Sequence, residues 1–332
     1  MRKKIYLQQI NQASEILLGL QDANTGCFFY PYQQRKTNYA NARWQEGVLT
    51  LAWLWKKNKS NELKNKIISG LDFWITLQHK NGSFPEYSKH DVSFSATAFS
   101  AITAAETIQL LGENGESKNW LGTLRKAGDW LAKNDELVLA NQEAAAAVAL
   151  LKIYFLLGDE KYLRAAEKKL AVVLDNQNAA GFYPEKGGFD FGYSSLTLEM
   201  LGHCHLALPK DEIIASANKF LALALNSKPG LKNSRQTNWA IIDGFEIFSD
   251  KCENGPAALN HVLKNFDVCH LETDQNVCTD SYRLCWAHDN TKLNLNLLPK
   301  ASAIGAKTFA SPSKLLNVFR PFGLHKLRRY LP

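Results

Sequence analysis

Two stretches of this sequence, Gln78-His-Lys-Asn-Gly82-Ser-Phe-Pro-Glu86 and Gln177-Asn-Ala-Ala-Gly181-Phe-Tyr-Pro-Glu185, follow one pattern and lie 99 residues apart. The same offset continues downstream, where Asp91, Phe94 and Ser95 match Asp190, Tyr193 and Ser194. An offset kept over this many positions indicates an internal repeat, and its length corresponds to two units of about 50 residues each. A weaker copy of the pattern runs from Gln21 to Pro31.

Helical periodicity runs almost from one end of the chain to the other, and no segment alternates as a β-strand would. The pattern predicts twelve helices in six pairs, over residues 3–20, 43–57, 60–78, 93–112, 117–133, 141–157, 159–177, 194–207, 211–226, 237–250, 256–266 and 279–289. The repeated motif ends the first helix of a pair and leads into the second.

The two helices of each pair differ in composition. Ser95–Ala105 and Glu143–Leu151 are small and apolar on most faces, which is typical of a buried helix, whereas Leu163–Ala171 is rich in lysine and glutamate. Alternation of outer and inner helices predicts an all-α fold, an (α/α)6 toroid of about twelve antiparallel helices in six hairpins. We expect one toroid domain over residues 1–292 and a C-terminal extension over 293–332. An open solenoid is the alternative, but a closed ring buries the inner helices better.

The bulk composition is that of an ordered protein, with 332 residues, 45% hydrophobic residues and a net charge of +7. The positive charge favours an acidic ligand or an anionic surface, although a solvated coat of lysines explains it equally well. No apolar run is long enough to cross a membrane, and the basic start is followed by no apolar segment. We therefore expect a cytoplasmic protein whose six cysteines are reduced and mostly buried. No motif for nucleic-acid binding is present.

Three motifs carry a resemblance to known proteins: Gly181–Tyr193, Ser234-Arg235 and Gly244-Phe-Glu246. The chain resembles the six-hairpin toroid enzymes, in particular the heparinase/alginate-lyase-type toroid proteins of polysaccharide metabolism. The resemblance implies a carbohydrate-active enzyme, a lyase, hydrolase or epimerase, acting on an acidic oligo- or polysaccharide, with exopolysaccharide metabolism as one context. No catalytic signature of those families is intact in this sequence.

In such a ring the N-termini of all inner helices gather at one end, which we call the mouth. Their unpaired N–H groups and partial positive charge suit carboxylate or phosphate groups, which favours an anionic sugar independently of the resemblance. The loops at this end supply the candidate residues. The catalytic candidates are Glu185, Asp190, Tyr193, His90 and Asp91. The candidates for substrate binding are Tyr39, Asn41, Arg43, Trp44, Glu86, Glu143, Arg235, Asn238 and Trp286. We expect no metal and no cofactor.

Structural roles compete with the catalytic ones. Asp91 and Asp190 directly precede inner helices, where N-capping is the simplest role of an aspartate. Glu86 and Glu185 recur in the repeat, which favours a structural role as brackets of the hairpins, and a core position is the competing role of Tyr193. Two mechanisms fit the candidates. A hydrolase needs two carboxyl groups, about 5–5.5 Å apart when retaining and about 6.5–9.5 Å when inverting. A lyase or epimerase needs a base and a group that neutralises the substrate carboxylate.

Two other functions remain open. The turn Gln78–Phe84 is similar to one repeated in triterpene cyclases, so a terpenoid or isoprenoid cyclase-like or prenyltransferase-like enzyme is an alternative, although the acidic DxDD motif is missing. A deep and nearly uncharged interior would favour it. The third function is a non-catalytic glycan-binding assembly protein, favoured if the carboxylates serve as caps and ion pairs.

Two further segments lie outside the predicted mouth. We expect Asp267–His270 at the end of an outer helix, away from the mouth. The basic, apolar tail over 319–332 offers a contact with a membrane surface, a protein or the ring itself.

Overall fold

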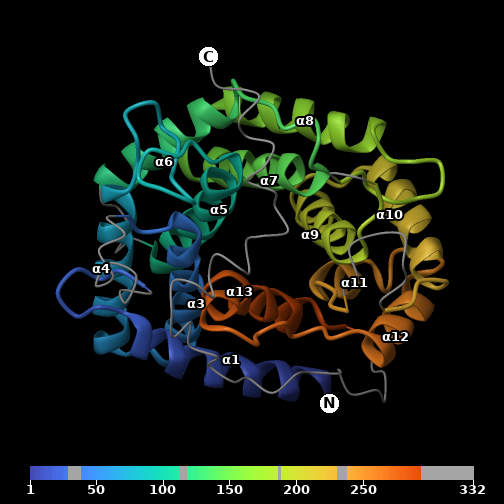
Figure 1. Ribbon diagram of the computed structural model, residues 1–332, viewed down its shortest axis with the longest axis horizontal. Coiled ribbons are helices and arrows are strands. Elements are labelled where there is room, and N and C mark those ends of the chain that lie inside the picture. Colours follow the sequence, from blue (N-terminus) through green and yellow to red (C-terminus); the bar gives the residue numbers. More distant parts are fainter. Residues whose placement is uncertain (29–38, 113–117, 186–187, 230–237, 293–332) are drawn as a thin grey trace.

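Two concentric rings of helices form the molecule, as the computed structural model in Figure 1 shows for residues 1–28, 39–112, 118–185, 188–229 and 238–292. The outer ring consists of α1 (Arg2–Leu20), α4 (Asn61–Thr76), α6 (Lys118–Leu131), α8 (Glu160–Asp175), α10 (Asp211–Ala224) and α12 (Gly255–Asn265). The inner ring consists of η1 (Ala42–Gly47), which continues into α3 (Val48–Asn58), then α5 (Phe94–Leu111), α7 (Ala140–Leu157), α9 (Phe191–Ala207), α11 (Asp243–Phe248) and α13 (Asp274–Asn290). Outer and inner helices alternate along the chain.

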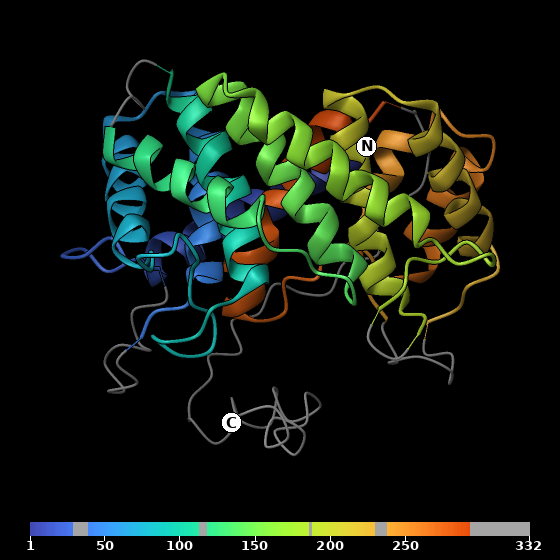
Figure 2. The same cartoon turned by 90° about the horizontal axis from the view of Figure 1, so that it is seen from above.

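The ring is closed rather than open. The last inner helix, α13, lies against α1, η1 and α3, so the two ends of the described chain meet (Figure 1). Seen edge-on in Figure 2, α8 slants across the near side of the ring. The predicted (α/α)6 toroid is therefore confirmed. Within the described residues, β-structure is limited to isolated bridges.

The composition of each helix matches its ring. In α5 all residues from Ser95 to Ala105 are buried, because other inner helices and the outer ring cover every face. In α8 burial follows a single stripe at helical spacing, formed by Tyr162, Ala166, Lys169, Leu170 and Val173. By length and composition α7 could also cross a membrane, but it is an inner helix and most of it is buried within the ring.

The repeated glutamine is a bracket between neighbouring outer helices. The amide of Gln78 donates from Nε2 to the carbonyl of Gly82 at 3.1 Å and to that of Thr123, in the next outer helix, at 2.9 Å. Gln177 makes the same pair of bonds, to Gly181 at 2.8 Å and to Ser216 at 2.9 Å. The weaker copy repeats the arrangement, since Gln21 donates to the carbonyls of Gly26 and Lys66.

The glycines and prolines of the motif complete this bracket. Gly82 has a φ of +98°, and a Cβ added there would lie 2.2 Å from the carbonyl oxygen of Lys126, so only glycine fits. The carbonyl of Pro85 accepts a hydrogen bond from the N–H of Ala42, at the start of the preceding inner segment. Pro184 does the same for Ala140. Each copy thus joins the preceding inner helix to the following outer helix.

Removal of either bracket should weaken the fold. We expect Gln78→Ala and Gln177→Ala each to lower the free energy of unfolding by about 1–3 kcal/mol, because two carbonyls lose their donor in a partly buried place. Urea denaturation measures this effect. Gln109→Ala on the exposed surface of α5 is the matched control, for which we expect a change within about 0.5 kcal/mol. Equal effects at Gln78 and Gln109 would show that the glutamine is not a bracket.

Two inner helices differ in length from their predicted spans. The fifth, α11, begins only at Asp243 because residues 238–241 are held extended. Ala240 donates to the carbonyl of Asp267 at 2.9 Å, and the N–H of Ile241 donates to Ser195 Oγ at 2.8 Å. The sixth, α13, begins five residues earlier than predicted, because Thr273 caps it by accepting from the N–H of Asn276 at 3.1 Å.

A buried ion pair joins the first helix to the fifth inner helix. Arg2 donates from Nε and Nη2 to the two carboxylate oxygens of Glu246, at 2.7 and 2.9 Å, and the Tyr6 hydroxyl donates to the same carboxylate at 3.0 Å. Both charged side chains are almost completely buried. This bidentate pair fixes α1 against the ring at the point where the ring closes.

Candidate functional site

Side chains from five of the six inner segments meet at the mouth. Arg43 of η1 donates from Nη1 to Ser95 Oγ of α5 at 2.9 Å. Tyr193 of α9 packs edge-on against Trp239, with ring centroids 5.6 Å apart. Trp239 precedes α11 and stacks on His270 at 4.7 Å, and His270 bonds to Asp280 of α13. Two groups of contacts therefore lie at this end of the axis, one around Arg43 and one that runs from Tyr193 to Asp280, and the charge of Arg43 acts on Asp280.

Neighbouring side chains hold the charged Arg43 guanidinium in place, and one of its nitrogen atoms is left to bind a ligand. Its Nε donates to Glu46 Oε1 at 2.5 Å, and its guanidinium lies over the ring of Phe99 at 4.3 Å. Burial works to lower the pKa of Arg43, but the charges of Glu46 and Glu86 raise it, so the side chain stays charged. The side chain is 17% exposed, and within the described residues Nη2 has no hydrogen-bond partner. The mouth thus presents a positively charged donor edge.

His270 combines four features that are unusual in one residue. Its backbone has a φ of +43°, a strained conformation for a residue other than glycine. Nδ1 lies 3.2 Å from Asp280 Oδ2, and the ring is stacked on Trp239. The side chain is 24% exposed, and within the described residues Nε2 has no partner. Such strain, held by neighbouring groups, is typical of functional sites.

The pKa values of His270 and Asp280 are shifted in opposite directions. Burial works to lower the pKa of His270, but the hydrogen bond and charge of Asp280 outweigh it and raise the pKa. Burial would raise the pKa of Asp280, yet His270, Arg283 and Arg43 together lower it. Asp280 is therefore the ionised partner, and His270 holds its proton more firmly than an ordinary histidine does.

Glu86 stands on the opposite side of the mouth. Its Oε2 accepts from the Ser93 hydroxyl at 2.6 Å, and the half-buried side chain is next to Tyr87, which is 57% exposed. Burial raises the pKa of Glu86, although the charge of Arg43 and the bond from Ser93 both oppose the shift. Asp91 holds this loop, since Oδ2 accepts from the N–H groups of Glu86 and Tyr87 at 3.2 Å each.

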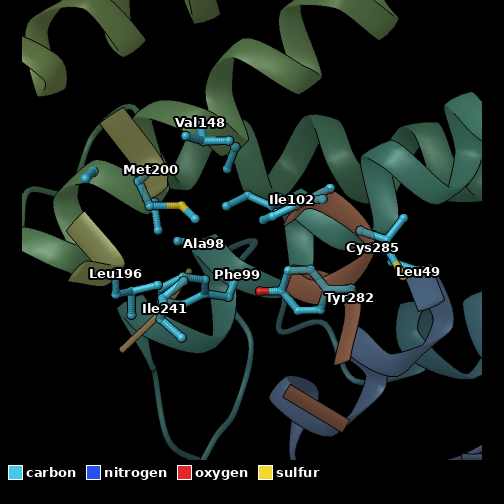
Figure 3. Close-up of a cluster of buried hydrophobic side chains, with 14 of the residues drawn as sticks. Leu49, Ala98, Phe99, Ile102, Val148, Leu196, Met200, Ile241, Tyr282 and Cys285 are labelled. Atoms are coloured by element: carbon cyan, nitrogen blue, oxygen red, sulfur yellow. The ribbon is translucent and has the colours of Figure 1, made fainter. Parts of the chain in front are cut away.

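Charged groups continue along the axis below the mouth. Arg283 donates from Nη1 to the buried carboxylate of Glu199 and from Nε to Asp280 Oδ1 at 3.3 Å. Burial raises the pKa of Glu46 to about 7 despite its bond to Arg43. An apolar layer follows beneath these groups, and in Figure 3 the Tyr282 hydroxyl points toward Phe99 within it. Two arginines and three carboxylates on the axis are the opposite of the nearly uncharged interior that a terpenoid cyclase would need.

The structure brings some predicted residues together and separates others. Those that meet at the mouth are Tyr39, Arg43, Glu86, Asp91 and Tyr193. Asp190 caps α9 by accepting from the N–H of Tyr193 at 3.1 Å. Glu185 accepts from the N–H and Nδ2 of Asn141, at 3.2 and 2.8 Å, at the start of α7. Glu143 pairs with Lys169 of α8 at 3.1 Å.

The remaining predicted residues hold structural positions, are exposed, or lie outside the described residues. Asn41 caps η1 by accepting from the N–H of Arg43 at 2.8 Å, and Trp44 is buried in the core. Trp286 lies toward the opposite end of the ring, where its indole donates to Glu106 at 2.9 Å. His90 is exposed, and Asn238 is bonded through its backbone carbonyl to the N–H of Asp267. Arg235 and the extension over 293–332 lie outside the described residues.

The expectation that Asp267–His270 lies away from the mouth was wrong. Because α13 begins at Asp274 rather than at 279, His270 belongs to the loop that enters an inner helix, as the other candidates do. Asp280 then falls in the second turn of that helix, within reach of His270. The cap at Thr273 was the sequence signal that could have revealed this position.

The described residues contain no cluster of three or more His, Cys, Asp or Glu side chains arranged to hold a metal ion. All six cysteines are buried. Burial raises the pKa of each thiol, to about 12 for Cys27 and Cys204, which disfavours the reactive thiolate. Arginine, carboxyl, tyrosine and histidine side chains lie at the mouth.

Comparison with known proteins shows the class of fold. No family model matches the sequence, and no curated protein matches it. Among solved structures, a variant of an unsaturated glucuronyl hydrolase from Streptococcus agalactiae has 13% identity and a TM-score of 0.61, over 88% of this chain and 92% of that one. The α-1,6-mannanase of Salegentibacter sp. HEL1_6 has 10% identity and a TM-score of 0.60, over 86% and 98%. A polysaccharide lyase has 12% identity and a TM-score of 0.52, over 84% and 97%.

These neighbours are (α/α)6 toroid enzymes that act on carbohydrates, and this chain has the same toroid fold. Identities of this size show the fold alone. The predicted resemblance to toroid carbohydrate-active enzymes is confirmed at that level.

Proposed function

We propose that the protein is a carbohydrate-active enzyme that binds an acidic oligo- or polysaccharide at the mouth and acts on it by lyase, hydrolase or epimerase chemistry. The observation that carries the proposal is the placement of the partly exposed Arg43 guanidinium within electrostatic range of Asp280, which holds His270. The fold supports it, because the structural neighbours include a glucuronyl hydrolase and a polysaccharide lyase.

Each group has a role that follows from its chemistry. Arg43 pairs with the substrate carboxylate, since a guanidinium binds a planar anion through paired N–H donors. Trp239 and Tyr193 form an amphipathic wall beside it. His270 transfers the proton through Nε2, because Asp280 holds Nδ1 and fixes the orientation of the ring.

These groups supply the chemistry that either mechanism would need. In a lyase or epimerase, neutral His270 removes the proton α to the carboxylate, while Arg43 stabilises the negative charge that develops. In a hydrolase, Glu86 is the acid, because its raised pKa keeps more of the carboxyl group protonated near neutral pH. Asp280, whose pKa is lowered, is then the ionised partner.

The proposal is tested by measuring turnover of a panel of acidic glycans by the protein and by a variant that keeps the positive charge of Arg43. Hyaluronan, alginate and oligogalacturonate are incubated with the protein, alongside carboxyl-reduced forms. Ultraviolet absorbance detects a new double bond and a reducing-sugar assay detects hydrolysis. We expect turnover of an acidic glycan and not of its reduced form. Arg43→Lys should lower kcat/KM about 10- to 100-fold, because lysine loses the paired donors but still neutralises Glu46.

Arg125→Lys, on the exposed surface of α6, is the matched control and should have the activity of the unmodified protein. Absence of both turnover and binding across the panel would contradict the proposed function. Equal turnover of the native and carboxyl-reduced glycans would contradict the assignment of Arg43.

One observation favours a second candidate function, a non-catalytic glycan-binding protein of polysaccharide assembly. Four predicted carboxylates hold structural contacts: Asp91, Glu143, Glu185 and Asp190. Calorimetric binding of an acidic glycan without any product would identify this function.

We also propose a cytoplasmic location. Five free, buried thiols support it, because such thiols need a reducing compartment to stay outside disulfides during folding: Cys204, Cys252, Cys269, Cys278 and Cys285. In that compartment the substrate would be an imported oligosaccharide or a glycan under assembly.

A further inference from the structure

A cavity of about 500 Å³ lies beside the mouth, on the outer side of the loop that carries Glu86. Its walls come from the end of α4, from the segment before η1 and from the loop between α4 and α5. The residues used in the argument are Tyr39, Phe73, Leu77, His79, Pro85 and Lys89. A volume of this size lies within the range of about 300–1,000 Å³ that is typical of small-molecule sites.

The walls of the cavity are held in place by the bracket motif. His79 donates its N–H to the carbonyl of Ser83 at 2.9 Å, and its Nε2 lies 3.0 Å from the carbonyl of Lys89. Gln78, also in the lining, joins this turn to α6. The cavity is therefore formed by fixed backbone, and ligand binding would need little ordering of the loop.

The cavity and the mouth share a wall. The carbonyl of Pro85, in the lining, accepts from the N–H of Ala42, which is the residue before Arg43. Pro85 itself precedes Glu86. Tyr39 also lines the cavity, and the charges of Glu86 and Asp91 add to burial in raising its pKa, so these groups lie within electrostatic range of one another. One layer of backbone thus separates the cavity from the mouth, and neighbouring units of one chain molecule would occupy the two by crossing over this wall.

The lining indicates the class of ligand. Phe73 and Tyr39 supply aromatic surface, and among the described lining residues the Lys89 ammonium is the only Lys, Arg, Asp or Glu charge. We propose that this cavity is a second subsite, which takes an acidic sugar unit of the same glycan next to the unit held by Arg43. The inference rests on the proposed function, and it makes an oligosaccharide rather than a single sugar the preferred ligand.

The experiment compares ligand lengths. Calorimetry measures binding of the di- and hexasaccharides of hyaluronan, alginate and oligogalacturonate to the full chain. We expect tighter binding of the hexasaccharide, and we expect Phe73→Ala and Lys89→Ala each to weaken it about tenfold while leaving disaccharide binding unchanged. Phe155→Ala and Lys264→Ala, at exposed positions of α7 and α12, are matched controls and should change neither.

Hydrogen exchange gives a second measurement that needs no variant. Residues 73–89 should gain protection with the hexasaccharide and not with the disaccharide. If the hexasaccharide binds, and neither the variants nor the exchange of residues 73–89 responds to its length, this inference is overturned and the proposed function stands. If none of the six oligosaccharides binds, the proposed function and this inference both fail.

Discussion

Glu246→Ala is expected to lower the free energy of unfolding by about 3–5 kcal/mol, because it leaves the Arg2 guanidinium buried without its counter-ion. The cost is large because both side chains are almost completely removed from water and the pair is bidentate. The Tyr6 hydroxyl also loses its acceptor. Chemical denaturation followed by circular dichroism measures the effect.

The exposed pair of Lys210 and Glu167, at 3.0 Å, provides the control. Glu167→Ala should change stability by no more than about 1 kcal/mol, since a solvated ion pair contributes little. The double variant Arg2→Met/Glu246→Ala should recover part of the loss, because no charge then stays buried and unpaired. A loss below about 1 kcal/mol for Glu246→Ala would show that the ring closes without this pair.

The architecture could be predicted from the sequence because the repeated glutamine makes the same two hydrogen bonds in each copy. Gln78 and Gln177 recur at a fixed offset since each holds the same two carbonyls, one in its own turn and one in the next outer helix. The start of α11 could not be predicted in this way. It depends on the bond from the Ile241 N–H to Ser195, which is distant in the sequence.

The candidate site was predictable by residue type and loop, and less so by role. Arg43, Glu86 and Tyr193 meet at the mouth because each lies at the entrance of an inner helix. Asp190 and Glu185 occupy equally suitable positions, but their carboxylates satisfy N–H groups at helix starts. A residue type in a loop does not reveal whether the side chain faces the axis or the backbone.

His270→Asn tests the chemistry of the mouth, and we expect it to lower kcat/KM by about 10²–10⁴-fold, the usual contribution of a general acid or base. Asparagine is chosen because it tolerates the positive φ at this position, and its amide can still donate to Asp280. The free energy of unfolding should therefore change by no more than about 1 kcal/mol. Steady-state kinetics on the acidic glycan identified in the panel give the rates.

The pH dependence identifies the role of the imidazole. Because Asp280 raises the pKa of His270, the pair stabilises the fold fully below the ordinary histidine pKa of about 6.5, and this stabilisation is lost as pH rises through the folded value. If His270 is a base, kcat/KM rises with pH through that value; if it is an acid, kcat/KM falls. Asp280→Asn removes the group that raises the pKa, so either limb should move to lower pH.

His90→Asn is the decisive comparison, because His90 is the histidine that the sequence nominates and the structure leaves exposed in the loop beside Glu86. We expect it to retain the activity of the unmodified protein. Loss of activity in His90→Asn with retention in His270→Asn would contradict the assignment of the strained histidine. The proton would then be transferred from the rim of the mouth, and the His270–Asp280 pair would serve only to hold Trp239 in place.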